Sequence, residues 1–179
     1  MLADDTLLDI YTLKDVVRYN CRKHLKEESV AEHSFYVALI ALMICEEKGI
    51  NDPDIIKDVL IKAVLHDMPE IELNDITHNV KERLNLRPFL KKFEDEYFEK
   101  KFTSYAMLMA DNSDDLVNAI VLYADAMSVK QYCLNEIALG NKSKDILEEI
   151  YPNAVERCEA HEKHLETFLK DKKKHLNYH

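Results

Sequence analysis

Two histidines and two aspartates lie at positions where the surrounding pattern predicts buried side chains: His33, His66, Asp67 and Asp125. Burying an unpaired carboxylate is costly, so buried aspartates are normally paired or bound to a metal ion. Two imidazoles and two carboxylates can satisfy one another through a shared cation. Such a set of nitrogen and oxygen donors is typical of Mn²⁺, Fe²⁺, Co²⁺ or Zn²⁺, and a six-coordinate ion would keep positions open for water. The four residues therefore predict a metal site suited to hydrolysis.

The helix that carries His33 is marked at both ends. Ser29-Val30-Ala31-Glu32 is a capping box before an apolar run, and Gly49 is expected to end the helix after about Lys48. His33 repeats at helical spacing with apolar residues, which are Val37, Ile40, Ala41 and Ile44. The histidine is therefore expected to point into the core.

His66 and Asp67 lie near the end of the next predicted helix, which begins at Asp52-Pro53. Neighbouring residues of a helix point about 100° apart, so this pair can share one ion only where the helix ends. Pro69 supplies that end because proline disrupts a continuing helix. Irregular backbone or a short helix is expected from Glu70 to Lys81, and loops of this kind often carry chemistry.

Asp125 belongs to a predicted long helix from Leu116 to about Leu139, which is expected to begin at the acidic segment 112–115 and to end at Gly140. The first half of this helix is apolar almost all round, apart from Asn118 and Asp125. It should be the most buried element, so its carboxylate needs a partner.

The remaining chain predicts outer helices. Residues 88–109 have the pattern of one amphipathic helix with acidic, basic and aromatic side chains. Residues 144–175 predict a helix interrupted at Pro152, followed by a heavily charged one.

The order and spacing of the four residues are more specific than any one of them. A histidine in Ala-Glu-His-Ser is followed after thirty-odd residues by Leu-His-Asp-Met-Pro-Glu, and after nearly sixty more by Ala-Asp-Ala-Met. This pattern resembles the HD-domain metal-dependent phosphohydrolases. The resemblance implies an all-α fold and assigns the metal ligands to His33, His66, Asp67 and Asp125.

Further motifs resemble the bacterial 5′-deoxynucleotidases over about Val16 to Asn141. They are Arg18-Tyr19, Ser29 to Ser34, His66-Asp67-x-x-Glu70, Asp75 and Tyr123-Ala124-Asp125-Ala126. In that family an arginine followed by an aromatic residue contacts phosphate and sugar, which implies substrate-binding roles for Arg18 and Tyr19. The family more usually has tryptophan at the second place, so Tyr19 is a departure that bears on deoxyribose selectivity.

The resemblance also implies that Glu70 and Asp75 act beside Asp67 in catalysis. Glu70 lies one turn beyond His66, where a carboxylate can orient or deprotonate water, or give a proton to the leaving ribose oxygen. Asp75 is expected to hold a sugar hydroxyl or to steady Glu70.

A lysine at the place of Lys81 is also found in the family, where its charge would neutralise a phosphate. Arg18 would add a bidentate clamp on the phosphate oxygens. Lys62 and Arg83 are further cations within possible reach of the phosphate.

Composition agrees with a helical domain. Two glycines and four prolines are too few for the many reversals of an all-β fold, and 47% apolar with 32% charged residues is typical of a globular chain. We expect one HD domain over residues 1–179, a bundle of about six or seven helices. The motifs occupy a core of about 16–141, and the C-terminal helices follow at 144–175.

Charge and hydropathy limit the partners. A net charge of −10 disfavours long nucleic acids and anionic membranes. No apolar stretch reaches the roughly 18 residues of a membrane span, and the N-terminal pattern is not that of a signal peptide, so a cytoplasmic protein is expected. The resemblance implies a homodimer or higher homo-oligomer.

The function that these resemblances imply is hydrolysis of a 2′-deoxynucleoside 5′-monophosphate to a deoxynucleoside and phosphate. One divalent ion, Mn²⁺, Co²⁺, Fe²⁺, Zn²⁺ or Mg²⁺, would be the cofactor. The nearest alternative is a deoxynucleoside triphosphate triphosphohydrolase that uses the same site. A second-messenger phosphodiesterase lacks support because no further histidine motif is present, and a nucleotide-binding module without turnover is disfavoured by Glu70 and Asp75.

Overall fold

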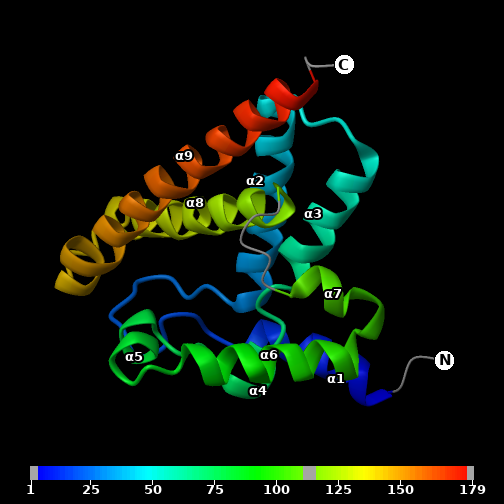
Figure 1. The fold of residues 1–179 in the computed structure, drawn as a ribbon. Helices are drawn as coiled ribbons and strands as arrows, with labels where there is room; N and C mark the ends of the chain where they lie inside the picture. The colour runs from blue at the N-terminus through cyan, green and yellow to red at the C-terminus, as the bar shows by residue number, and fades with distance from the viewer. Residues whose placement is uncertain (1–3, 111–115, 177–179) are drawn as a thin grey trace.

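Helices form most of the structure, a computed structural model that describes residues 4–110 and 116–176. The main body consists of α2 (Val30–Lys48), α3 (Pro53–Leu65), α8 (Leu116–Ala138) and α9 (Tyr151–Leu176) (Figure 1). The shorter helices are α1 (Asp4–Thr12), α4 (Glu70–Leu73), α5 (His78–Arg83), α6 (Arg87–Lys101) and α7 (Ala106–Met109). Single turns of other helix types are η1 (Leu13–Asp15), η2 (Thr103–Tyr105) and η3 (Asp145–Ile150). The predicted all-α fold is confirmed.

The ends of α2 and α3 follow the sequence prediction. Ser29 Oγ accepts a hydrogen bond from the Glu32 amide at 3.2 Å, and the Glu32 carboxylate accepts one from the Ser29 amide at 2.9 Å. Gly49 ends α2 in the left-handed conformation, with φ of 68°. Asp52 caps α3, which ends at Leu65 and leaves His66 and Asp67 in the following turn.

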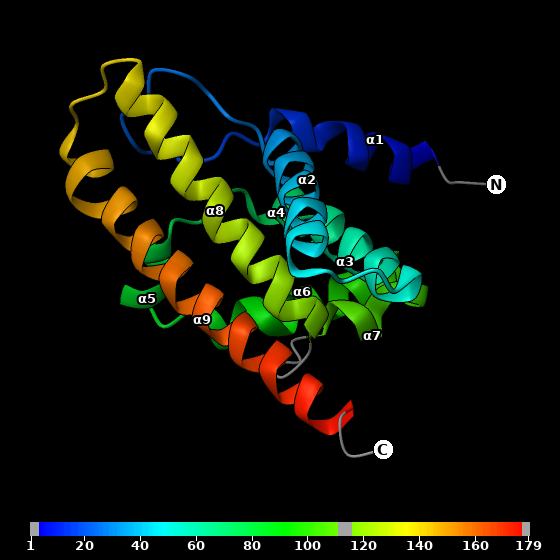
Figure 2. The ribbon, with the colours of Figure 1, turned by 90° about the horizontal axis from the view of Figure 1, so that it is seen from above.

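Helix α8 is the central element of the fold. Seen from above, it lies between α9 on one side and α2 and α3 on the other (Figure 2). Its Ile120 and Ala124 are fully buried in the main apolar cluster with residues of α2 and α3. The predicted acidic start at residues 112–115 lies outside the described residues. Asp125 therefore belongs to the most buried helix, as its sequence pattern indicates.

Two of the predicted outer helices differ from the structure. Residues 88–109 do not form one helix, because Phe102 leaves the helical conformation with φ of −134° and ψ of 49°. Its ring packs against Tyr97 and Phe98, and the chain turns into η2 and α7. Pro152 does not interrupt the C-terminal helix. The wider π-helical turn of η3 comes directly before it and accommodates a residue that has no amide hydrogen.

The length and hydropathy of the described helices do not match those of a membrane span. Within the described ranges, none is both long and apolar enough to cross a bilayer.

Candidate active site

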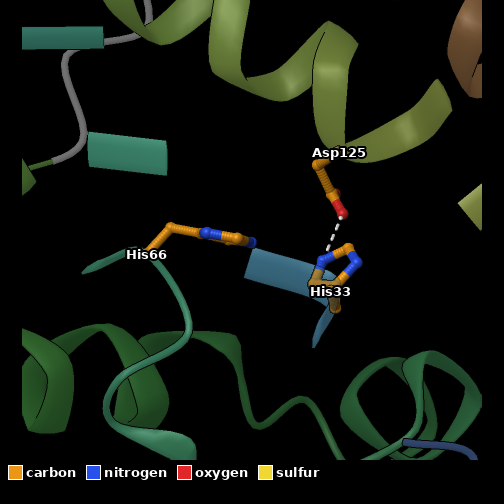
Figure 3. A group of neighbouring side chains, drawn as sticks. All are labelled: His33, His66 and Asp125. Atoms are coloured by element: carbon orange, nitrogen blue, oxygen red, sulfur yellow. Dashed lines mark ion pairs between the residues drawn. The ribbon is translucent and has the colours of Figure 1, made fainter. Parts of the chain in front are cut away.

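His33 lies at the centre of the site and is fully buried on α2. Its Nε2 faces two carboxylates, Asp125 Oδ1 at 3.2 Å and Asp67 Oδ2 at 3.5 Å. Its Nδ1 lies 2.8 Å from Arg18 Nη1 and 3.1 Å from Ser128 Oγ. Figure 3 shows the imidazole of His33 with Asp125 above it and His66 reaching toward it from the left. The capped start of α2 thus places one ring nitrogen among acids that come from two other segments.

His66 reaches the same point from the turn after α3. Its Nδ1–H donates to the carbonyl of Ala63 at 2.8 Å, which leaves Nε2 as the nitrogen that faces the cluster. That Nε2 lies 3.2 Å from Asp67 Oδ2. The rings of His33 and His66 meet edge to face with centroids 5.3 Å apart.

The donor set fits a divalent metal ion. His33, His66 and Asp125 each offer a ligand atom, and these three atoms lie within 4.8 Å of one another. Among the described residues, the buried Nε2 atoms of both histidines have no partner with hydrogen-bond geometry, although carboxylates lie close by. Asp67 Oδ2 adjoins both of these nitrogens. Buried imidazole nitrogens beside ionised oxygens are the ligands that Mn²⁺, Fe²⁺, Co²⁺ and Zn²⁺ accept.

The proton on His33 decides whether this ring can bind a metal. A guanidinium only donates, so in the arrangement described Nδ1 accepts from Arg18 and the ring proton is on Nε2. Metal binding at Nε2 requires the proton on Nδ1 instead. Ser128 Oγ is in place to accept a hydrogen bond from Nδ1 in that form. Ser128 would then be the partner of Nδ1–H, and the Arg18 guanidinium, which cannot accept a hydrogen bond, would give up its contact with Nδ1 and keep Glu28 as its partner.

Burial and neighbouring charges shift the pKa values of the four residues of the cluster. Burial would raise the pKa of Asp67, but His66 beside it holds that pKa well below its usual range. Burial would also raise the pKa of Asp125, but His33, whose Nε2 lies 3.2 Å away, lowers this pKa instead. Burial lowers the pKa of His33 to about 4, assisted by the Arg18 cation. Burial would lower the pKa of His66 too, but the charge of Asp67 raises it to about 9. Both carboxylates are therefore ionised at neutral pH.

A cavity of about 620 Å³ opens beside this cluster. Its walls include seven of the predicted site residues, namely Arg18, Tyr19, Asp67, Glu70, Asp75, Lys81 and Asp125. Besides Glu70, the lining holds four carboxylates against four cationic side chains, Arg87 and Arg157 among the latter. The cavity alone therefore has no surplus positive charge for an anion, and a bound divalent ion would provide it.

Arg18 and Tyr19 form a strained turn in the wall. Tyr19 has a φ of 54°, which is rare for a residue with a side chain. Its amide donates to Asp75 Oδ2 at 2.5 Å, and its ring stacks on Tyr132 at 5.1 Å. Arg18 is buried and bridges Glu28 and His33. The contact that the structure shows for Asp75 is thus to the Tyr19 backbone, rather than to Glu70.

Glu70 lies at the start of α4, deep in the cavity wall. Its Oε2 is buried without a hydrogen-bond partner in the described part of the chain, and Lys81 Nζ lies 3.8 Å from Oε1. Burial, and then the negative charge of Asp67, raise the pKa of Glu70 to about 9. Glu70 is therefore protonated at neutral pH and can donate a proton.

Two predicted cations do not contribute to the cavity. Lys62 is buried elsewhere, and its Nζ donates to the carbonyls of Leu108 and Ala110 at 3.1 and 3.3 Å, at the end of α7. Arg83 is exposed and is absent from the cavity lining. The position of a lysine or arginine near a motif does not fix the direction of its side chain.

The C-terminal helix contributes residues that the sequence analysis missed. Asn153, Arg157 and His161 of α9 line the cavity, and Arg157 Nη2 donates to Asp125 Oδ2 at 2.7 Å. Their spacing of four residues places them on one face of a helix. That spacing was the available signal, but in a highly charged segment it does not distinguish a cavity wall from a solvated face.

The 5′-deoxynucleotidase YfbR-like family matches the chain over residues 7–175. The chain belongs to the YfbR-like 5′-deoxynucleotidase family. It is therefore an HD-domain phosphohydrolase. The family match extends beyond residues 16–141, where the motifs lie, and includes the part of α9 that lines the cavity.

Individual relatives of this YfbR-like protein have sequence identities between 22 and 30%. The chain is 30% identical to the 4′-phosphooxetanocin A phosphatase of Priestia megaterium over 152 residues, which are 79% of this chain and 77% of that protein. It is 26% identical to a 5′-deoxynucleotidase of Pectobacterium atrosepticum over 145 residues, covering 72% and 71% of the two proteins. A solved HD-domain phosphohydrolase of Listeria innocua superposes with a TM-score of 0.67 at 22% identity, covering 84% of this chain and 77% of that one. This last likeness shows the HD-domain fold.

Proposed function

We propose that this protein is a metal-dependent 5′-deoxynucleotidase, which hydrolyses a 2′-deoxynucleoside 5′-monophosphate to a deoxynucleoside and phosphate. One observation carries the proposal: two buried imidazole nitrogens face the carboxylates of Asp67 and Asp125 beside a cavity that Arg18 and Glu70 also line. The cavity volume of about 620 Å³ is within the range of small-molecule sites. The names of the two relatives, a phosphatase and a 5′-deoxynucleotidase, agree with it.

His33, His66, Asp67 and Asp125 would hold the metal ion. When bound, a divalent ion lowers the pKa of water and polarises a phosphoryl oxygen. The identity of the ion among Mn²⁺, Co²⁺, Fe²⁺, Zn²⁺ and Mg²⁺ is left to experiment. The hydrogen bond to Ala63 orients His66 with Nε2 toward the cluster, and a metal ion would take the place of the proton that the raised pKa keeps on this nitrogen.

The chain's own residues would bind the phosphate and supply the proton. Arg18 and Lys81 neutralise the phosphate charge, which otherwise repels an attacking oxygen. As the bond between phosphorus and the 5′-oxygen breaks, the leaving oxygen needs a proton. Glu70, which is protonated at neutral pH, can give it, and the product is a neutral deoxynucleoside.

A monophosphate fits the charges of the cavity better than a triphosphate. Each of the four cations already lies beside an acidic side chain. Arg18 contacts Glu28, Lys81 lies near Glu70, Arg87 contacts Glu82 and Arg157 contacts Asp125. Besides Glu70, the four carboxylates of the lining would repel the additional charges of a triphosphate. We therefore prefer the monophosphate to the triphosphohydrolase alternative.

The test is product analysis by chromatography after incubation with Mn²⁺ or Co²⁺, and with a chelator as control. The panel contains deoxynucleoside monophosphates, deoxynucleoside triphosphates and the matching ribonucleotides. Orthophosphate and deoxynucleoside from the monophosphates alone would support the proposal. Products from triphosphates alone would replace it with the triphosphohydrolase. If the protein with added metal forms no product from any nucleotide of the panel, the result would favour a nucleotide-binding module without turnover.

The same panel examines Tyr19, which we propose lies against the sugar. Its ring is held by stacking on Tyr132 in the wall of the cavity. Replacing Tyr19 by Ala should change the ratio of deoxyribonucleotide to ribonucleotide turnover while metal binding is retained. An unchanged ratio would remove Tyr19 from the sugar pocket.

We also propose that the protein is a cytoplasmic homo-oligomer. Helix α2 exposes an apolar row at spacing four, Phe35, Leu39 and Met43, which are 59, 44 and 71% exposed. Exposed apolar side chains that lie together mark an interaction surface, and a second copy of the chain would remove this row from water. Light scattering at micromolar concentration would show a mass of at least twice the 20.9 kDa of the chain.

A further inference from the structure

Arg157 joins α9 to the metal centre although it lies outside the predicted motifs. Its Nη2 donates to Asp125 Oδ2 at 2.7 Å, while Asp125 Oδ1 faces His33 Nε2 at 3.2 Å. The two oxygens of Asp125 therefore serve different partners. One oxygen belongs to the metal cluster, and the other fixes the guanidinium of Arg157.

Arg157 also lies where two hollows adjoin. Arg157 lines both the cavity of about 620 Å³ and a smaller hollow of about 110 Å³. The two hollows also have four other lining residues in common, which are Tyr19, Thr77, Val129 and Asn153. A molecule that extends from the metal cluster into the smaller hollow would therefore pass the guanidinium. About a third of the Arg157 side chain is exposed, at 36%.

Arg157 has more capacity for a ligand than Arg18. Arg18 is only 9% exposed and contacts both Glu28 and His33. A guanidinium has five N–H donors, and the hydrogen bond to Asp125 uses one of those of Arg157. Asp125 also shares its charge with His33 and with any ion at the cluster, so it neutralises Arg157 only in part.

We propose that Arg157 is a substrate-binding residue that holds the phosphate of the substrate, with Asp125 fixing its orientation in advance. This inference rests on the proposed function, because it takes the phosphate ester as the ligand of the cavity. A guanidinium oriented before the substrate arrives loses little freedom on binding. The active site then includes α9, in addition to the segments that carry the motifs.

The test compares three variants, Arg157→Ala, Arg157→Lys and Lys163→Ala. Lys163 is the matched control, because it is an exposed cation of the same helix and is absent from the lining of the cavity. Calorimetry with Mn²⁺ and inorganic phosphate measures binding, and initial rates with a deoxynucleoside monophosphate separate KM from kcat. Titration with Mn²⁺ alone measures the metal stoichiometry.

Arg157→Ala should weaken phosphate binding and raise KM by about 10- to 100-fold, since a hydrogen bond to a charged group is lost. The Mn²⁺ stoichiometry should stay at the wild-type value. Arg157→Lys should recover part of the affinity, because lysine keeps the charge but loses the planar fork. Lys163→Ala should remain within about twofold of wild type, as expected for a surface charge.

Two results would overturn the inference. One is phosphate affinity in Arg157→Ala equal to that of Lys163→Ala, and the other is loss of Mn²⁺ binding in both Arg157 variants, which would show a structural role. Phosphate binding by a wild-type protein that hydrolyses no nucleotide would count against the proposed function instead. The role of Arg157 would then be decided by the phosphate titrations of the wild-type protein and its variants.

Discussion

Glu70 has the features of a proton donor. It lies beside Asp67 in the cavity wall, its Oε2 is buried, and its pKa is raised to about 9 by burial and by that neighbouring charge. Lys81, 3.8 Å away, limits the rise. A carboxyl group kept neutral at pH 7 can protonate the leaving 5′-oxygen.

Replacing Glu70 by Gln should therefore lower kcat by about 10²- to 10⁴-fold, the usual contribution of a general acid. An amide keeps the neutral shape of the protonated carboxyl, so the melting temperature and the Mn²⁺ stoichiometry should stay close to wild type. Steady-state rates, thermal unfolding and metal titration check these three expectations. Wild-type kcat in this variant would exclude Glu70 as the acid.

The structure brings together the four residues that the sequence proposes as metal ligands, because each combines a motif with a helix position. His33 lies on an inward stripe, and His66 lies just before a proline. Arg157 and Ser128 could not be predicted in this way. Their roles depend on side-chain directions across helix pairs, and no spacing along the chain encodes the contact of Arg157 with Asp125.

Single elements were predictable where local chemistry fixes their ends. Ser29 and Gly49 mark α2, and both ends lie where their caps indicate. The break at Phe102 was not predictable, because it depends on the packing of this ring against Tyr97 and Phe98. Local propensity in that region still favours one continuous helix.

Glu136 shows how α8 positions the segment that precedes α2. Its buried carboxylate accepts hydrogen bonds from the amides of Leu25 and Lys26 at 2.7 and 2.9 Å, and from Asn141 Nδ2 at 2.6 Å. Burial would raise the pKa of Glu136, but these donors lower it below its ordinary value of 4.5. The loop that follows Arg18 is thereby tied to α8.

Glu136→Gln should reduce the free energy of unfolding by about 1–3 kcal/mol at neutral pH, because the amide cannot accept all of these bonds. The ionised carboxylate stabilises the fold above about pH 4.5, and this contribution is lost as the pH falls through the lower pKa of the folded state. Urea denaturation of both proteins from pH 7 to pH 3 should show the difference shrinking in acid. A difference that grows in acid would contradict the assignment.

At the scale of the molecule, α9 packs along α8 and completes both the core and the cavity (Figure 2). Leu165 of α9 is fully buried in the cluster that includes Val37 of α2, Val59 of α3 and Ile120 of α8. We therefore propose that residues 1–179 form one cooperative domain. The sequence indicated this extent by length and composition, although the motifs end near residue 141.

Leu165→Ala should lower the free energy of unfolding by about 2–5 kcal/mol, because it leaves a cavity in the shared core. Unfolding should remain one transition at a lower temperature, whether followed by circular dichroism or by calorimetry. Lys163→Ala, on the exposed side of the same helix, should leave the midpoint close to wild type. Two separate transitions, of which Leu165→Ala shifts one, would show that α9 belongs to a different unit.

The central claim is that the His33, His66, Asp67 and Asp125 cluster holds the metal ion that hydrolysis requires. The most direct test is phosphate release from a deoxynucleoside monophosphate by protein stripped with a chelator and then titrated with Mn²⁺, beside His66→Ala treated in the same way. We predict no release without metal, recovery that saturates with Mn²⁺ in the wild-type protein, and neither recovery nor tight Mn²⁺ binding in His66→Ala. Full activity of the stripped protein, or equal recovery in His66→Ala, would contradict the account.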